Sequence, residues 1–162
     1  MRLHNLVIEE SDAAKIDEIL VNFLRESGAT EALLIDRSGQ PLAMSGQFGS
    51  LDTVSISALA AGAFASTGAM AQLLGEPEFT VLFHQGVKAN IYVSTVGDHA
   101  ILMAIFGANT TVGMVRLFAR ETIGAIEAIL TETRTRPRQS LGLGGPLGVN
   151  EVDSTFRELS AD

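Results

Sequence analysis

Residues 53–75 read TVSISALAAGAFASTGAMAQLLG, 23 positions without a charged side chain. Because glycine commonly follows the last turn of a helix, Gly75 marks the end of the run, and residues 51–74 are predicted as one long helix. The length would suffice to cross a bilayer. However, most of its residues are Ala, Gly, Ser or Thr, and Asp52 and Glu76 flank it without basic residues, so we expect no membrane span.

Large apolar side chains are scarce in this helix, and we expect them to face the rest of the chain. These are Val54, Leu59, Phe64, Met70 and Leu73. A second, flat and apolar face would then stay uncovered, formed by Ala58, Ala61, Gly62, Ala65, Ala69 and Gln72. Since every other predicted element already has a place, this face is expected to contact a partner chain, first of all a second copy.

Two further helices flank the strands. The first is expected to begin with Ser11 as its N-cap and to end at Gly28. Its apolar stripe is Ile16, Leu20, Phe23 and Leu24. The last helix is expected to be capped by Thr111 and to run to about Arg134. Its buried face would be Val115, Phe118, Ala119, Ile123, Ile126 and Leu130.

Five short apolar runs are predicted as strands. They are residues 31–36, 41–45, 79–85, 90–96 and 100–106. The links inside the first pair and inside the last three are too short for parallel crossovers, so neighbouring strands should be antiparallel. Pro41 suits the start of a strand and fits poorly in a central one. The order α-β-β-α-β-β-β-α therefore predicts an α+β fold, a five-stranded antiparallel sheet sandwiched by helices.

The composition argues against several classes of function. The 162 residues, 46% hydrophobic, suffice for one core, and a net charge of −8 with two lysines argues against nucleic-acid binding. The absence of cysteine excludes disulfides, thiolate nucleophiles and Cys-ligated metal sites. The first ten residues lack the apolar core of a signal peptide, so we expect a cytoplasmic protein.

No constellation of residues indicates catalysis. The glycines of residues 142–145 lack the preceding strand and following helix of a phosphate-binding loop. The three histidines (His4, His84 and His99) are far apart in sequence, without metal-ligand spacing. No serine stands in a nucleophile motif. We therefore expect no catalytic residue, no metal and no cofactor.

Several stretches together resemble the Roadblock (dynein light-chain type) family, and within it the bacterial MglB proteins. No single motif establishes the resemblance; the order and spacing of the stretches over residues 9–134 do. The stretches are residues 32–39 (ALLIDRSG), 51–53 (LDT), 60–62 (AAG), 73–76 (LLGE) with Phe79, 84–86 (HQG), 91–93 (IYV), 105–106 (IF) and 111–117 (TVGMVRL).

The resemblance implies a homodimeric activator of MglA, a small Ras-like GTPase that sets polarity in motile bacteria. It implies a cytoplasmic protein, at a cell pole, that orders the GTPase's own switch residues without donating a catalytic one. The implied GTPase contacts are Ala61, Gly62, Ala65, Ala69 and Gln72, and the implied dimer contacts are Ala58, Gly68 and Ala71. Arg37, in a hairpin turn, is an outside candidate for an arginine finger. A scaffold that binds partners without stimulating hydrolysis is the alternative.

The chain divides into three parts. Residues 1–136 form the expected Roadblock domain, residues 137–148 a Gly/Pro-rich flexible linker, and residues 149–162 an amphipathic segment. That segment carries Val152, Phe156 and Leu159 at i, i+4 and i+7. It is either a frayed tail or a helix that docks on a partner, and the sequence leaves both open.

Overall fold

The computed structural model describes residues 8–135. Their order is α1 (Glu10–Ser27), β1 (Glu31–Asp36), β2 (Pro41–Gly46), α2 (Thr53–Leu74), β3 (Val81–Gln85), β4 (Asn90–Val96), β5 (Ala100–Phe106) and α3 (Val112–Thr135). The predicted α-β-β-α-β-β-β-α order is confirmed, and most boundaries agree within two residues. The linker and the amphipathic segment of residues 137–162 lie outside the described residues.

The five strands form one antiparallel sheet in the order β2-β1-β5-β4-β3. The central strand β5 is buried on both faces, because its even-numbered residues face one apolar cluster and its odd-numbered residues the other. Pro41 begins β2, which is an edge strand, as its missing N–H requires. The other edge is β3.

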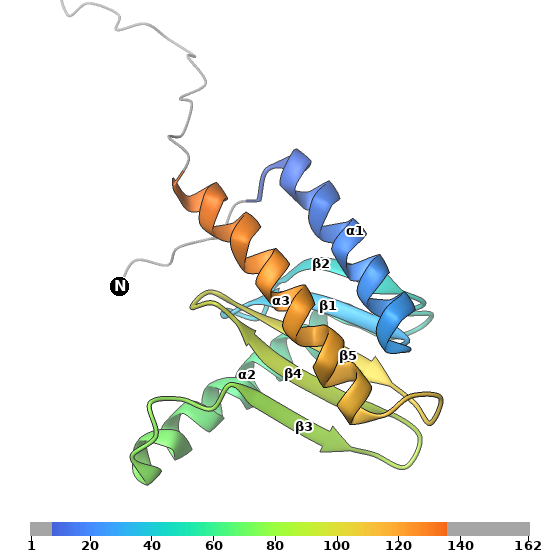
Figure 1. Ribbon diagram of the computed structural model, residues 1–162. Coiled ribbons are helices and arrows are strands. Elements are labelled where there is room, and N and C mark those ends of the chain that lie inside the picture. Colours follow the sequence, from blue (N-terminus) through green and yellow to red (C-terminus); the bar gives the residue numbers. More distant parts are fainter. Residues whose placement is uncertain (1–7, 136–162) are drawn as a thin grey trace, which may run out of the picture.

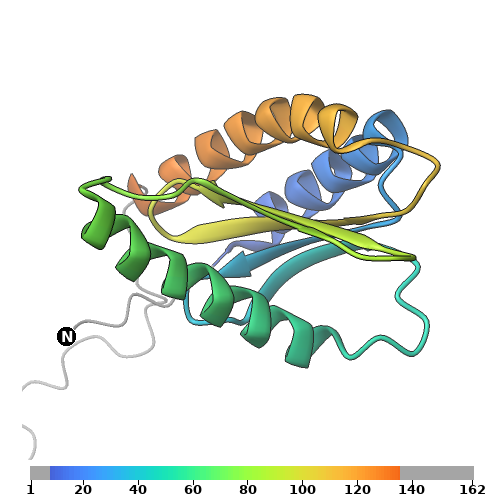
Figure 2. The same cartoon turned by 90° about the horizontal axis from the view of Figure 1, so that it is seen from below.

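Helices cover both faces unequally. Helices α1 and α3 lie side by side on one face, whereas α2 lies alone on the other (Figures 1 and 2). The two paired helices are antiparallel and tied at both ends: the Thr133 hydroxyl donates to Asp12 at 2.7 Å, and the Thr110 hydroxyl to the Ser27 carbonyl at 2.6 Å. The α+β sandwich is thus confirmed.

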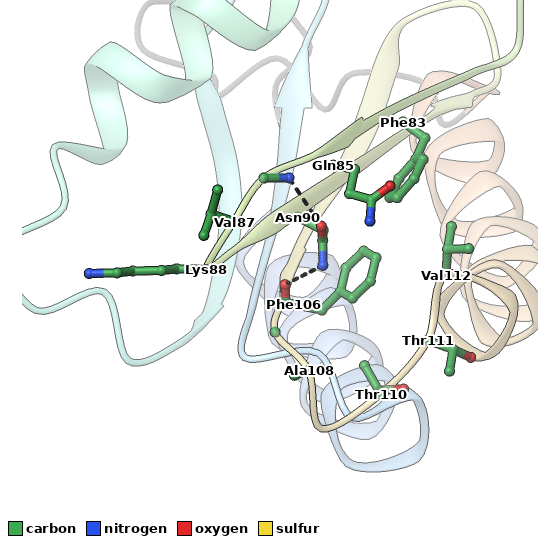
Figure 3. Close-up of a pocket in the computed structure, with 12 residues that line it drawn as sticks. Phe83, Gln85, Val87, Lys88, Asn90, Phe106, Ala108, Thr110, Thr111 and Val112 are labelled. Carbon is green, nitrogen blue, oxygen red and sulfur yellow. Dashed lines mark hydrogen bonds between the residues drawn. The ribbon is translucent and has the colours of Figure 1, made fainter.

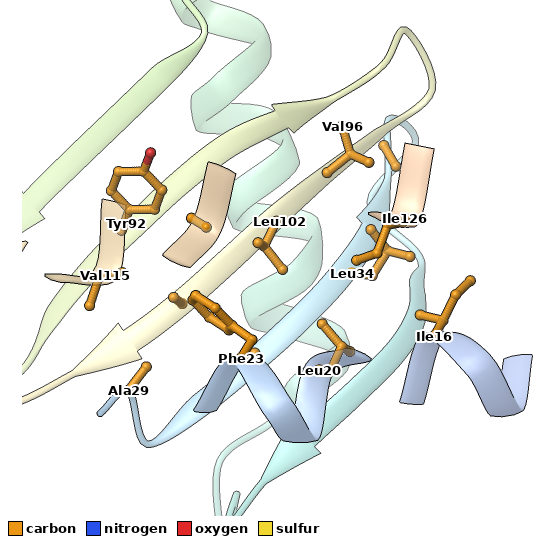
Figure 4. Packing of buried hydrophobic residues seen from close by; sticks show 14 of the residues in the cluster. Ile16, Leu20, Phe23, Ala29, Leu34, Tyr92, Val96, Leu102, Val115 and Ile126 are labelled. Carbon is orange, nitrogen blue, oxygen red and sulfur yellow. The ribbon is translucent and has the colours of Figure 1, made fainter. Parts of the chain in front are cut away.

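The main core lies between the sheet and the pair α1 and α3 (Figure 4). Of the stripe expected on α1, Ile16, Leu20 and Phe23 are buried and Leu24 is half-buried. The expected face of α3 is likewise buried or half-buried. Burying one such large apolar side chain contributes about 1.5–3 kcal/mol, so this side of the sheet carries most of the domain's stability.

Of the two predicted N-cap residues, the structure confirms one and contradicts the other. Thr111 caps α3, since its Oγ1 accepts the backbone N–H of Met114 at 3.2 Å. Ser11 does not cap α1; the cap position is Glu9, whose carbonyl accepts the N–H groups of Asp12 and Ala13 at 3.0 and 2.9 Å. Ser11 therefore lies inside the first turn, and Glu9 makes no side-chain cap hydrogen bond.

Candidate functional site

Helix α2 is well defined at both ends. At its start Asp52 accepts two hydrogen bonds from Ser55, one from the backbone N–H at 3.0 Å and one from the hydroxyl at 2.6 Å. These bonds, the hydroxyl's first, lower the pKa of the Asp52 carboxyl below its ordinary value. At its end Gly75 adopts the left-handed conformation, φ 74°, and closes the last turn. The helix needs no tertiary partner to fix its length.

The face of α2 that meets the sheet is the small-residue face. Its buried residues are Ser57, Ala61, Phe64, Thr67 and Ala71. Of the large residues expected there, only Phe64 is inside; the others, Val54, Leu59, Met70 and Leu73, are 51–88% exposed. That expectation was wrong because small side chains let the helix lie close to the sheet, whereas bulky ones would hold it away. A helix apolar all round gives no periodic signal to orient it.

Two exposed flanks follow from this orientation. The flat flank consists of Ala58, Gly62, Ala65, Ala69 and Gln72, spaced so that they share one side of the helix. The bulky flank consists of Leu59, Ala63, Met70 and Leu74 on the other side. Together they leave α2, which spans 22 residues without a charge, with most of its apolar surface in solvent. Large exposed apolar surfaces on one element mark an interaction site.

The turn between β1 and β2 packs beside the flat flank. The Arg37 guanidinium carbon lies 5.4 Å from the centroid of the Phe64 ring, and its Nη2 donates to the Gly97 carbonyl at 3.3 Å. Gly39, at φ 96°, approaches so closely that a Cβ would stand 2.9 Å from the Cα of Ala58. A hollow of about 250 Å³ remains beside Arg37, Ala65 and their neighbours.

A groove runs along the bulky flank. Its volume is about 260 Å³, and its walls come from α2, β3, β4 and β5, among them Leu59, Ala63, Leu82 and His84. Nearly all of these side chains are apolar. Strand β3 is the edge of the sheet, so its outer backbone groups have no strand partner within residues 8–135. An apolar groove and an open strand edge thus adjoin each other.

The residues singled out from sequence fall into two groups. Ala58, Gly62, Ala65, Ala69 and Gln72 are exposed, and Gly68 is half-buried. Space is open at Gly62 and Gly68, where a Cβ would meet nothing within 4 Å. Ala61 and Ala71 are buried, so neither lies on an exposed surface, because the small-residue side of α2 faces inward. Val152, Phe156 and Leu159 lie outside the described residues.

Sequence reasoning missed the bulky flank as a surface. Leu59, Ala63, Met70 and Leu74 follow one another at i, i+4, i+11 and i+15, a spacing that places them on one side of a helix. This signal was present but was assigned to the sheet contact. The two described histidines lie apart, His84 on β3 and His99 in the β4–β5 turn. Within residues 8–135 no three His, Asp or Glu side chains are grouped to hold a metal ion.

Buried acids in this part of the chain serve the fold. Asp36 accepts the Ser38 hydroxyl at 2.7 Å and the Gln40 N–H at 2.9 Å, which shapes the β1–β2 turn. Asp12 accepts the hydroxyl of Thr133 and pairs with Lys15 at 3.8 Å. Every buried side-chain nitrogen or oxygen of residues 8–135 has a hydrogen-bond partner. Helix α2 carries the largest run of exposed apolar side chains of any one described element, among them Val54, Leu59, Met70, Leu73 and Leu74.

This arrangement defines a Roadblock-type domain, and the Roadblock/LC7 domain family matches residues 15–106. The chain belongs to this family and, within it, to the MglB-like proteins. Myxococcus xanthus MglB is 33% identical with a TM-score of 0.73, over 76% of this chain and 99% of that one. The gliding protein mglB from Thermus thermophilus is 35% identical with a TM-score of 0.75, over 79% and 97%.

A third structure, described as MglB with tetrameric arrangement, is 34% identical with a TM-score of 0.76, over 80% of this chain and 97% of that one. A comparison with curated protein sequences gave no match. Helix α2 is long and apolar enough to pass a length-and-composition test for a membrane span. In this fold it is instead a helix of the domain, packed on the sheet through Phe64 and its small residues.

Proposed function

We propose that the chain is a homodimeric activator of GTP hydrolysis by an MglA-type small Ras-like GTPase, in the cytoplasm and at a pole of a motile bacterial cell. The observation that carries this proposal is the uncovered apolar surface of α2 in an MglB-like domain. One flank is suited to a second copy and the other to the GTPase. The activator has no cofactor and acts through its surface.

The second copy covers the bulky flank. Leu59 is 72% exposed and Leu74 also 72%, beside an apolar groove of about 260 Å³. Edge strand β3 lies next to them, and its outer backbone groups, which have no strand partner within residues 8–135, could pair with a second β3. A two-fold axis here would bring groove and helix of each copy together. Of the dimer contacts implied by the resemblance, Gly68 offers open space, whereas Ala71 is buried within the domain.

The GTPase contacts the flat flank. Gly62, Ala65 and Ala69 present little side-chain volume, and Gln72 offers an amide at the end of the row. A flat surface of this kind can lie against the GTPase's switch segments and hold them in one arrangement. Ala61, buried below, keeps the helix close to the sheet and does not itself touch the GTPase.

Activation requires no residue donated to the reaction. Raising the population of a competent switch arrangement from about 1% to near full occupancy increases the rate about a hundredfold. An arginine finger would contribute on the order of 10³–10⁵. Arg37 is the candidate nearest the flat flank, but its guanidinium already contacts Phe64 and the Gly97 carbonyl. We therefore assign it a structural role.

The test is GTP hydrolysis by an MglA-type GTPase with and without the chain. We expect a rate increase of about a hundredfold that saturates as the chain is added. A GTPase that binds the chain but hydrolyses GTP at its basal rate would make the chain a scaffold and refute activation. A GTPase that does not bind would refute both roles.

A further inference from the structure

A second groove lies on the face opposite α2. It has a volume of about 380 Å³ and is bounded by the β3–β4 turn, the end of β5 and the start of α3 (Figure 3). Its apolar floor is formed by Phe83 and Phe106, whose stacked rings have centroids 6.1 Å apart and an interplanar angle of 18°. Val112 adds an apolar wall at the start of α3, whereas Val87 in the β3–β4 turn is fully exposed (Figure 3). The groove belongs to neither flank of α2.

The groove is preformed. The Asn90 side chain accepts the N–H of Gly86 at 3.2 Å and donates to the Phe106 carbonyl at 3.4 Å, which fixes the β3–β4 turn against β5 (Figure 3). Thr111 caps α3 and so fixes the opposite wall. Because these contacts already order the site, binding a ligand there would cost little further conformational entropy.

The α3 side of the groove is basic in an acidic protein of net charge −8. Lys88 borders the groove in the β3–β4 turn, but its side chain extends away from Phe83, Phe106 and Val112 (Figure 3). Arg116 and Arg120 are exposed and follow Val112 at i+4 and i+8, so the row runs from the groove along α3. Apolar floor and basic rim together fit a segment with an apolar stripe and acidic flanks.

The chain itself contains such a segment outside the described residues. Its apolar stripe is Val152, Phe156 and Leu159, and its charged residues are Glu151, Asp153, Arg157, Glu158 and Asp162. The stretch of chain between Thr135 and this segment is long enough to reach the groove. The groove lies at the start of α3, about 36 Å of helix from Thr135. The 17 residues from there to Val152 can span about 56 Å when extended.

We propose that residues 149–162 dock in this groove, with Phe156 against Phe83 and Phe106 and the acidic residues toward Arg116 and Arg120. The groove is that of the same copy or of its paired copy. Tethering raises the effective concentration of the segment to the order of millimolar, so weak contacts suffice. The bound segment leaves α2 free, and the proposal stands independently of the GTPase.

The chain's lack of cysteine allows a direct test on the full protein. A spin label on Ser160→Cys should broaden the backbone amide signals of residues 83–90 and 107–113 more strongly than those of residues 53–75, which lie on the other face of the sheet. Broadening on α2 instead, or on no part of the domain, would overturn the proposal. A label that broadens only signals of an added MglA-type GTPase would assign the segment to that partner and overturn it as well.

Matched variants separate docking from mere proximity. Phe156→Asp should lower the broadening at the groove by roughly tenfold or more, since the burial of one large apolar side chain is lost. Ser154→Asp adds the same charge on the opposite side of the predicted helix and should leave the broadening unchanged. Val112→Asp places an acid at the start of α3, where the helix dipole favours it, so the fold is kept while docking is lost. Broadening that survives Phe156→Asp and Val112→Asp would contradict the proposal.

Discussion

The guanidinium carbon of Arg37 lies 5.4 Å from the centroid of the Phe64 ring, so a turn of the sheet and the centre of α2 are joined by one cation–π contact. Phe64 is the one large side chain that α2 buries in the sheet. Arg37 covers it from the solvent side and is itself held by the Gly97 carbonyl. The contact fixes the flat flank relative to the β1–β2 turn.

Replacing Arg37 by Ala should therefore weaken the fold and spare activation. We expect the free energy of unfolding in urea to fall by about 0.5–1 kcal/mol, the usual contribution of an exposed cation–π pair. Stimulated GTP hydrolysis should stay within a few-fold of wild type. Arg37→Lys, which keeps the charge, is the control for stability. A drop of roughly a thousandfold in the stimulated rate would instead mean that Arg37 is an arginine finger.

The proposed contact between the flat flank and the GTPase can be tested by placing large charged side chains on that flank. Ala65→Arg with Ala69→Arg places two long cations on an exposed apolar contact and should abolish GTPase binding and stimulation. Both positions are exposed, so the domain should unfold at the same urea concentration as wild type. The same pair of changes at Ala125 and Ala128, exposed on α3, is the control and should leave stimulation intact. Normal stimulation by the α2 variant would refute the surface proposed for the GTPase.

The approach of Gly39 to α2 predicts a large local effect. At φ 96°, with a Cβ 2.9 Å from the Cα of Ala58, an alanine is both strained and obstructed. Gly39→Ala should lower the free energy of unfolding by about 1–3 kcal/mol. Gly49→Ala is the matched control, since Gly49 also has a positive φ but nothing within 4 Å. Equal effects of the two changes would show that backbone strain alone, and not contact with α2, governs the turn.

The Asp52 cap makes α2 sensitive to acid. Because its hydrogen bonds to Ser55 lower the folded-state pKa, the stabilisation is present above the ordinary value of 3.8 and is lost as pH falls through the lower folded-state value. Asp52→Ala should therefore reduce stability to urea at neutral pH and make little difference in strong acid. Asp52→Asn keeps a capping side chain without the titration, so its stability should change less with pH. A deficit of Asp52→Ala that persists in full below the folded-state value would contradict this role.

Much of the fold could be predicted from local chemistry. The predictions for Gly28, Thr111 and Gly75 were right because end signals act through the backbone of their own neighbourhood. The antiparallel pairing of β1 with β2 and of β3, β4 and β5 followed from their short links, whereas the pairing of β1 with β5 had no such signal. The start of α1 differed from the prediction, since Ser11 lies inside the first turn and the cap position is Glu9, which makes no side-chain cap hydrogen bond.

The orientation of α2 could not be predicted in the same way. With apolar residues on every side, sequence spacing does not say which side meets the sheet, and side-chain size decides it instead. On the buried side, Phe64 is the one large side chain among small ones such as Ala61, whereas Leu59 and Leu73 lie outside. The groove at Phe83 and its basic rim required the register of β3, β4 and β5, which no single segment reveals.

If another chain covers the exposed apolar surface of α2, the protein is at least a dimer in solution, which sedimentation equilibrium at micromolar concentration measures. We expect a mass of at least twice the 17.1 kDa of one chain, and about 17.1 kDa for Leu59→Glu with Met70→Glu. Val21→Glu, at an exposed position of α1, should behave as wild type. A wild-type mass of 17.1 kDa would refute pairing through α2.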